Sequence, residues 1–151
     1  LHFTIHSFPT RRSSDLWASE LAAGNRGRIG LRIGYAEDLA HLIYAGADAL
    51  AIPSRFEPCG LSQLIAMRYG TLPVARATGG LRDTIEHGVT GFLFDHANAD
   101  GLAWAAEEAR LALADGRADG MRTEAMRRDF GWRRSAEAYA ATYAELTEGR
   151  G

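Results

Sequence analysis

Residues 49–75 read ALAIPSRFEPCGLSQLIAMRYGTLPVA and place two short apolar runs on either side of a loop and a helical pattern. The runs 49–52 and 72–75 have the length and composition of strands that are buried on both faces of a parallel sheet. Residues 61–68 between them have helical character and are followed by a stop signal at Gly70. The stretch therefore predicts a strand, a crossover helix and a second, parallel strand.

The same alternation continues in both directions along the chain. We expect strands at 28–33 and 91–94 in addition to the two above, which gives four strands with covering helices. The helices are expected at 17–23, 37–46, 61–68, 80–86, 99–114, 121–126 and 132–146. The pattern predicts an α/β fold, a Rossmann-like doubly wound parallel sheet, in one domain spanning 17–146. Residues 147–151 are expected to be a disordered tail.

Composition excludes several classes of protein. A chain of 151 residues is about one domain, and 46% hydrophobic with 24% charged residues is typical of a folded globular protein. A net charge of −2 and scattered basic residues indicate no nucleic-acid partner, and no run is long enough to cross a membrane. One cysteine allows no internal disulfide, which suits the cytoplasm, and the five histidines lack metal-ligand spacing. We expect no metal and no cofactor.

Residues 1–16 do not match the rest of the chain. The run 6–16, HSFPTRRSSDL, resembles the conceptual translation of a common sequencing adapter over all its eleven residues. A polar loop is the alternative interpretation, but we expect 1–16 to be a non-native segment that carries no information about the fold. If that is correct, genuine coding sequence upstream of residue 17 is missing.

Ligands of open parallel sheets bind beyond the carboxyl ends of the strands. Three loops are predicted to lie there: 34–35, 54–60 and 77–80. We expect these three loops to form the functional site at one edge of the sheet.

The loop 53–60 contains the most chemical information. Pro58 restricts Glu57 to an extended backbone, so that a carboxylate is presented at a fixed angle, and Gly60 permits a sharp turn into the next helix. The first amides of that helix, Gly60, Leu61 and Ser62, have no intrahelical partner and could hold an anion such as a pyrophosphate. The alternative is that Ser62 only caps the helix and Glu57 is a surface carboxylate; spacing alone does not separate the two.

The remaining candidates are weaker. Thr78-Gly79-Gly80 is a second possible anion cradle, although a tight turn is the better interpretation from sequence alone. Tyr35 could cover the base of a ligand, or could be an ordinary half-buried packing residue. Arg55 could contact a phosphate or could be a solvated surface residue.

Five segments together resemble one family. They are Ile33-Gly-Tyr35, Ala45-Gly-Ala-Asp48, the Pro53 to Leu61 loop, Met67 to Pro73 and Arg76 to Thr84, and Asp129-Phe-Gly-Trp132 follows them. Their order and spacing are similar to those of bacterial glycogen synthases and plant starch synthases over 17–146. The run SRFEPCGL is the most specific part, since other sugar-nucleotide glycosyltransferases keep the glutamate but usually lack Cys-Gly-Leu.

The resemblance implies the carboxy-terminal half of a retaining glucosyltransferase with two Rossmann domains, the GT-B architecture. Such an enzyme transfers glucose from ADP-glucose to the non-reducing end of an α-1,4-glucan without a metal. Glu57 matches the catalytic acid that faces the donor sugar. The positions that match donor binding are Tyr35, Cys59, Gly60, Leu61 and Ser62, with Arg55, Thr78, Gly79 and Gly80 as supporting residues. Tyr35 would stack on adenine, and Cys59 would line the pocket rather than act as a nucleophile.

Two departures from the family pattern limit what this chain is expected to do. Ser62 stands where the family often has threonine, a change that keeps the hydroxyl. The family's amino-terminal domain, which supplies a second phosphate loop and the acceptor surface, is not found in this sequence. We therefore expect a fragment that is inactive alone and that requires this domain as a partner. The alternatives are a sucrose synthase-like transferase and a non-catalytic ADP- or glucan-binding module.

Overall fold

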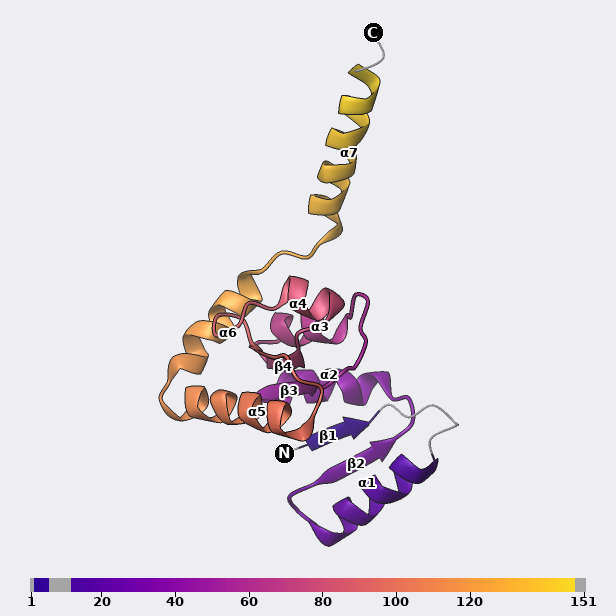
Figure 1. Ribbon diagram of the computed structural model, residues 1–151, viewed down its shortest axis with the longest axis vertical. Coiled ribbons are helices and arrows are strands. Elements are labelled where there is room, and N and C mark those ends of the chain that lie inside the picture. The colour runs from indigo at the N-terminus through magenta and orange to yellow at the C-terminus, as the bar shows by residue number, and fades with distance from the viewer. Residues whose placement is uncertain (1, 6–11, 149–151) are drawn as a thin grey trace.

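The computed structural model describes residues 2–5 and 12–148 of the chain. Strands alternate with helices as far as residue 114, and two further helices follow (Figure 1). The elements are β1 (His2–Ile5), α1 (Arg12–Gly24), β2 (Gly30–Ile33), α2 (Glu37–Gly46), β3 (Ala49–Ile52), α3 (Ser62–Arg68), β4 (Leu72–Arg76), α4 (Gly79–Thr84), β5 (Phe92–Phe94), α5 (Ala99–Ala114), α6 (Arg117–Arg127) and α7 (Trp132–Glu148). The predicted α/β alternation is confirmed.

A three-stranded parallel sheet with the order β3-β4-β5 lies at the centre of the molecule. Strand β4 is the middle strand, and its first four residues, 72–75, are buried. The side chains of β4 alternate between the two faces, as a strand requires. Leu72 and Val74 join a core cluster formed with α5 and α6, whereas Ala75 joins a second cluster with Leu81 of α4. The sheet is therefore covered by helices on both faces, as in a Rossmann-like fold.

The expectation of one four-stranded sheet is wrong. Strand β2, which was expected to extend the central sheet, pairs instead with β1 in a separate two-stranded parallel sheet. Three residues of β2, Gly30, Arg32 and Ile33, are exposed, and only Leu31 is partly covered. Because β2 buries little apolar surface, burial gives little driving force for adding it to the central sheet, and β1 provides a hydrogen-bonding edge for it instead.

Part of the segment 1–16 has regular structure. Strand β1 and the first residues of α1 fall within it, and neither was predicted, since 1–16 was expected to be non-native. Residues 6–11 lie outside the described residues. The adapter origin of 1–16 stays a prediction.

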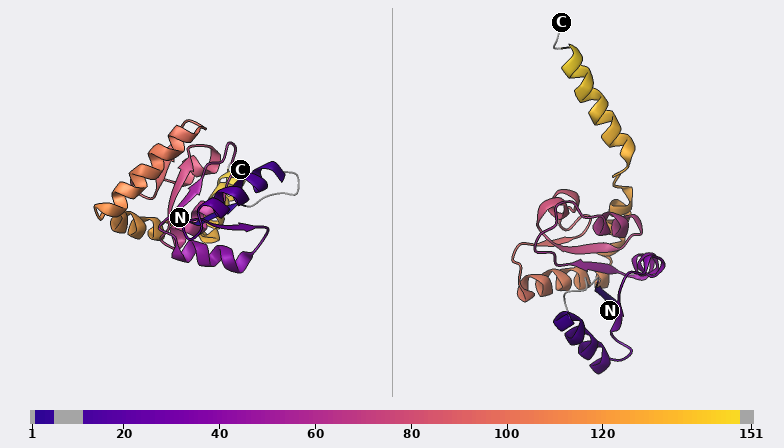
Figure 2. Two further views of the ribbon diagram at one scale, coloured as in Figure 1. Left: turned by 90° about the horizontal axis from the view of Figure 1, so that it is seen from below. Right: turned by 90° about the vertical axis from the view of Figure 1, so that its right-hand side faces the viewer.

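Helix α7 extends away from the rest of the molecule in Figure 1 and in the right-hand view of Figure 2. It continues to Glu148, so two residues of the expected tail are helical, and residues 149–151 lie outside the described residues. Its large side chains are strongly exposed: Trp132 at 87%, Tyr139 and Tyr143 at 64% each, and Leu146 at 62%. None of the helices formed by residues 12–148 has the length and apolar character needed to cross a bilayer.

Candidate functional site

The loops that follow β3, β4 and β5 meet at the carboxyl edge of the central sheet. Arg76, the last residue of β4, links the loop after β3 to the loop after β5. Its Nη1 donates to the carbonyl oxygen of Arg55 at 2.6 Å, and its Nε donates to the carbonyl oxygen of Asp95 at 3.3 Å. Two of the three predicted site loops, 54–60 and 77–80, are therefore neighbours at this edge.

The glycine loop before α4 packs against the segment that contains Glu57. The amide of Gly80 donates to the carbonyl oxygens of Glu57 at 3.2 Å and Pro58 at 3.1 Å. A Cβ atom added at Gly79 would overlap the carbonyl oxygen of Glu57, and one added at Gly80 would overlap that of Cys59. These glycines permit close backbone approach, and the Gly80 amide is already occupied by protein acceptors. Thr78-Gly79-Gly80 therefore supports the neighbouring loop.

Glu57 is half-buried within this loop. The hydroxyl of Ser54 donates to its Oε2 at 3.4 Å, which is a long hydrogen bond. The neighbouring Phe56 is 80% exposed, and Glu57 itself is partly exposed, so the carboxylate lies close to solvent at the carboxyl edge of the sheet. The carboxylate is therefore accessible, while the backbone of its loop is held by the Gly80 amide.

The turn after Glu57 leads into α3 one residue later than predicted. Gly60 has a φ of +74°, a conformation that favours glycine, and α3 begins at Ser62 rather than at Leu61. Leu61 is the N-cap residue and makes no side-chain cap hydrogen bond, so Ser62 is not the cap. The Cys59 thiol is free and exposed, and Leu61 is 71% exposed.

Several backbone amides of this turn are unoccupied. Within residues 2–5 and 12–148, no protein acceptor receives a hydrogen bond from the amides of Cys59, Gly60, Leu61 or Ser62. Consecutive unpaired amides form a concave site with partial positive charge, which suits the oxygens of a phosphate. The predicted anion site at Gly60, Leu61 and Ser62 thus has donors available.

Gln63 is a site residue that the sequence reasoning missed. It is fully buried, and its Nε2 donates to the carbonyl oxygens of Cys59 at 3.0 Å and Gly60 at 2.9 Å. The same nitrogen lies 3.2 Å from the hydroxyl oxygen of Thr84 in α4. The signal in the sequence was an amide side chain directly before the apolar residues 64–67, since a buried polar side chain needs hydrogen-bond partners.

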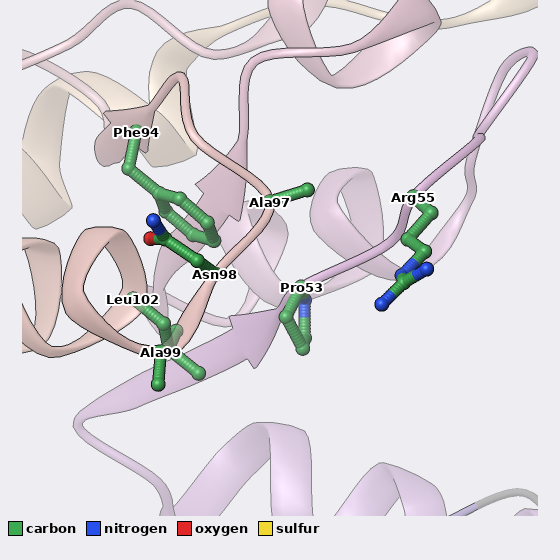
Figure 3. Close-up of a pocket in the computed structure, with 7 residues that line it drawn as sticks. All are labelled: Pro53, Arg55, Phe94, Ala97, Asn98, Ala99 and Leu102. Carbon is green, nitrogen blue, oxygen red and sulfur yellow. The ribbon is translucent and has the colours of Figure 1, made fainter.

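A pocket of about 270 Å³ opens beside Arg55 at the same edge of the sheet (Figure 3). Figure 3 shows Pro53 and Ala97 between Arg55 on one side and the start of α5 on the other. The pocket is lined by Pro53, Arg55, Phe94, Ala97, Asn98, Ala99 and Leu102. The Arg55 side chain is exposed, so a guanidinium is available at the rim.

Tyr35 does not share the edge at which these loops meet, because it follows β2 in the two-stranded sheet. The predicted position of Tyr35 at that edge, which rested on its place directly after a strand, is therefore wrong. Its ring is 79% exposed, and its hydroxyl donates to Oε2 of Glu37 at 3.1 Å. The hydrogen bond and negative charge of Glu37 raise the pKa of Tyr35 above its ordinary value.

Among the residues that the structure describes, no group of three or more histidine, cysteine, aspartate or glutamate side chains could hold a metal ion.

Known proteins resemble this chain in sequence over most of its length. Residues 10–117 match a family model described as glycosyl transferases group 1. The chain is 49% identical over 128 residues to a glycogen synthase of Pseudomonas syringae pv. syringae, and the match covers 84% of this chain and 26% of that protein. The chain thus spans about a quarter of the length of the curated relatives it matches.

Two solved structures resemble the fold. The catalytic domain of starch synthase IV from Arabidopsis thaliana, bound to ADP and acarbose, has a TM-score of 0.76 and 36% identity. That match covers 87% of this chain and 29% of the plant chain. A sucrose-phosphate synthase from Thermosynechococcus elongatus has a TM-score of 0.73 at 27% identity. That match covers 99% of this chain and 39% of the synthase chain.

Proposed function

Because the chain belongs to the group 1 glycosyl transferases, we propose that it is the carboxy-terminal, nucleotide-sugar-binding part of a glycogen or starch synthase. The observation that carries the proposal is 49% identity to a glycogen synthase over 128 residues, a match too long to leave out the 53–63 loop. The starch synthase with a similar fold was solved with ADP bound, which supports an adenine nucleotide as the ligand.

The reaction of the whole enzyme is glucosyl transfer from ADP-glucose to the non-reducing 4-hydroxyl of an α-1,4-glucan, with retention at the anomeric carbon. In this proposal, Glu57 faces the hexose of the donor. Positive charge develops at the anomeric carbon as the bond to ADP breaks, and a nearby carboxylate stabilises that charge. The half-buried, accessible position of Glu57 supports this role.

The unpaired amides of Gly60 and Leu61, with the amide and hydroxyl of Ser62, hold the distal phosphate of the donor. Hydrogen bonds to that phosphate strengthen as it takes up the negative charge of the leaving group, which favours bond cleavage. Arg55 adds a positive charge beside the phosphates. No metal ion takes part in this scheme.

Tyr35 stacks on the adenine and Cys59 forms part of the wall of the donor pocket. In the present structure the β2 strand that carries Tyr35 is paired away from the central sheet. Stacking therefore requires the loop at 34–35 to approach the Glu57 loop when the nucleotide binds.

The chain alone binds the nucleotide without transferring glucose, since the acceptor surface and further phosphate ligands come from the amino-terminal domain of the complete enzyme. Lost transition-state donors cost roughly 10²–10³ in rate apiece. The match to the Pseudomonas syringae glycogen synthase covers 26% of that protein.

Isothermal titration of ADP into the purified chain tests the binding part of the proposal. We expect saturable binding at one site, with UDP bound more weakly. Tighter binding of UDP than of ADP would favour the sucrose synthase-like alternative, which the 27% identity to a sucrose-phosphate synthase keeps open. Absence of binding to either nucleotide would contradict the proposal.

A further inference from the structure

The loop from Arg55 to Gly60 is held almost entirely by its carbonyl groups. Arg76 of β4 donates to the carbonyl oxygen of Arg55, and the Gly80 amide of α4 donates to those of Glu57 and Pro58. The Gln63 side chain of α3 donates to the carbonyl oxygens of Cys59 and Gly60. Three elements, β4, α4 and α3, therefore hold this loop through hydrogen bonds to five of its carbonyl oxygens.

Holding a carbonyl group also fixes the next amide. In a trans peptide the C=O of one residue and the N–H of the following residue lie in one plane and point in opposite directions. The peptide bonds of the described residues are not cis. A donor on the Cys59 carbonyl therefore directs the Gly60 amide outward, and a donor on the Gly60 carbonyl directs the Leu61 amide outward.

We propose that Gln63 is a positioning residue that sets the direction of the two phosphate-binding amides, those of Gly60 and Leu61. This inference rests on the proposed function of those amides and adds the residue that orients them. A single nitrogen, Nε2, reaches both carbonyl oxygens, at 3.0 Å and 2.9 Å. Because one atom holds both groups, the two peptide planes keep a fixed relation to each other.

The surroundings of Gln63 fix the orientation of its amide group. Its Nε2 is 3.2 Å from the hydroxyl of Thr84, and that hydroxyl donates to the carbonyl of Gly80. Among the described residues the Gln63 Oε1 has no hydrogen-bond partner, and it lies 2.4 Å from the position that a Cβ atom of residue 60 would take. Exchanging the oxygen and nitrogen would place an acceptor against three oxygens, so the donor must face the loop.

This arrangement leaves the Oε1 atom of Gln63 buried without a hydrogen-bond partner among the described residues. A fully paired amide would stabilise the fold more, because an orphaned acceptor has a desolvation cost. The unpaired oxygen therefore offsets part of the stability that the Nε2 hydrogen bonds provide. Removal of its donor is expected to affect ligand binding beyond any general loss of stability.

Gln63→Met tests the inference, because methionine has a similar length and no donor. We expect ADP affinity, measured by isothermal titration, to fall about tenfold, the effect of losing one well-directed hydrogen bond to a charged group. Thr71→Val is the matched control. The Thr71 hydroxyl is also buried and bonded to two backbone carbonyls, those of Tyr44 and Ala47, but at the opposite end of β4.

Thr71→Val should lower the melting temperature and leave ADP affinity unchanged. Equal affinity of Gln63→Met and the parent chain would overturn the positioning role and leave the proposed function intact. Gln63→Glu provides a second variant of nearly identical shape, in case methionine prevents folding. Its carboxylate repels the loop carbonyls, but its protonated form can donate, so ADP affinity relative to the parent should recover as pH falls. A flat pH profile for that ratio would also overturn the inference.

A second measurement separates this inference from the proposed function. If the parent chain binds no ADP, the proposed function has failed, and amide hydrogen exchange then decides the positioning role. The Gly80 amide should exchange about tenfold faster in Gln63→Met than in the parent, because the displaced loop withdraws its carbonyl acceptors. Exchange at Gly80 that matches the parent after correction for global stability would contradict the inference.

Discussion

The backbone amide of Gly80 lies 3.2 Å from the carbonyl oxygen of Glu57 and donates a hydrogen bond to it. A residue on α4 thus holds the segment that carries the candidate catalytic carboxylate. The contact is possible because Gly80 has no side chain, since a Cβ atom there would overlap the backbone of Cys59. The position of Glu57 therefore depends on a glycine that is 23 residues away in sequence.

Gly80→Ala should displace the loop and destabilise the fold. Overpacking of this kind costs roughly 1–3 kcal/mol of the free energy of unfolding, which urea denaturation can measure. Gly120→Ala is the control, because Gly120 lies in α6 and an added Cβ would meet nothing within 4 Å. That variant should gain about 0.5–1 kcal/mol from helix propensity. Equal stabilities for the two variants would contradict the packing described.

Cys59, the single cysteine of the chain, reports directly on occupancy of the site. Its thiol is free and exposed, next to the amides that are proposed to hold the phosphate. ADP should slow the alkylation of Cys59 by iodoacetamide in proportion to the fraction of sites occupied. Adenosine, which lacks phosphates, should protect less at the same concentration. An alkylation rate that is indifferent to saturating ADP would argue that the nucleotide lies elsewhere.

The hydrogen bond from Tyr35 to Glu37 has a measurable consequence in titration. Because Glu37 accepts from the neutral phenol and repels the phenolate, the pKa of Tyr35 is raised. The stabilising contribution of this pair is present below the ordinary tyrosine pKa and is lost as pH rises through the raised value. Glu37→Gln should lower the Tyr35 pKa, as followed by NMR of the ring carbon that bears the hydroxyl. An unchanged pKa in that variant would mean that the hydrogen bond does not form in solution.

Helix α7 should govern the solubility of the chain. Tyr139, Tyr143 and Leu146 lie at helical spacing with more than 60% of each exposed, and such an apolar stripe promotes association. Deletion of the residues after Trp132 should lower the apparent mass in analytical ultracentrifugation at high concentration and raise solubility. The melting temperature should change little, because α7 contributes no buried side chain within its described residues. Reduced solubility of the shortened chain would count against this account.

The elements with the strongest local signals could be predicted from sequence. Helices α2 and α5 and strand β3 have the predicted bounds, because regular apolar spacing was bounded by clear turn signals. Helix α6 begins at Arg117, four residues before the expected start. The cause is Gly116, which takes a left-handed φ of +83° as the N-cap residue, and Gly120, which weakens the helical pattern from within.

Long-range relations could not be predicted in the same way. The pairing of β2 with β1 depends on competition between strand edges, and local periodicity does not report on it. The loop 53–60 could be predicted from its place after strand 49–52 and from Glu57, Pro58 and Gly60, and two of the three predicted loops meet at one edge. The roles of Gln63 and Gly80 depend on contacts between separate elements, which spacing within one segment does not specify.

The most direct test of the central claim replaces the matching region of the Pseudomonas syringae glycogen synthase with residues 17–146 of this chain. Incorporation of labelled glucose from ADP-glucose into glycogen is then measured for the chimaera and for its Glu57→Gln variant. We expect the chimaera to transfer glucose, and Glu57→Gln to bind ADP normally but transfer roughly 10²–10³ times more slowly. A folded, ADP-binding chimaera whose transfer rate is the same with Gln at position 57 would contradict the assignment of this loop as the glucosyl donor site.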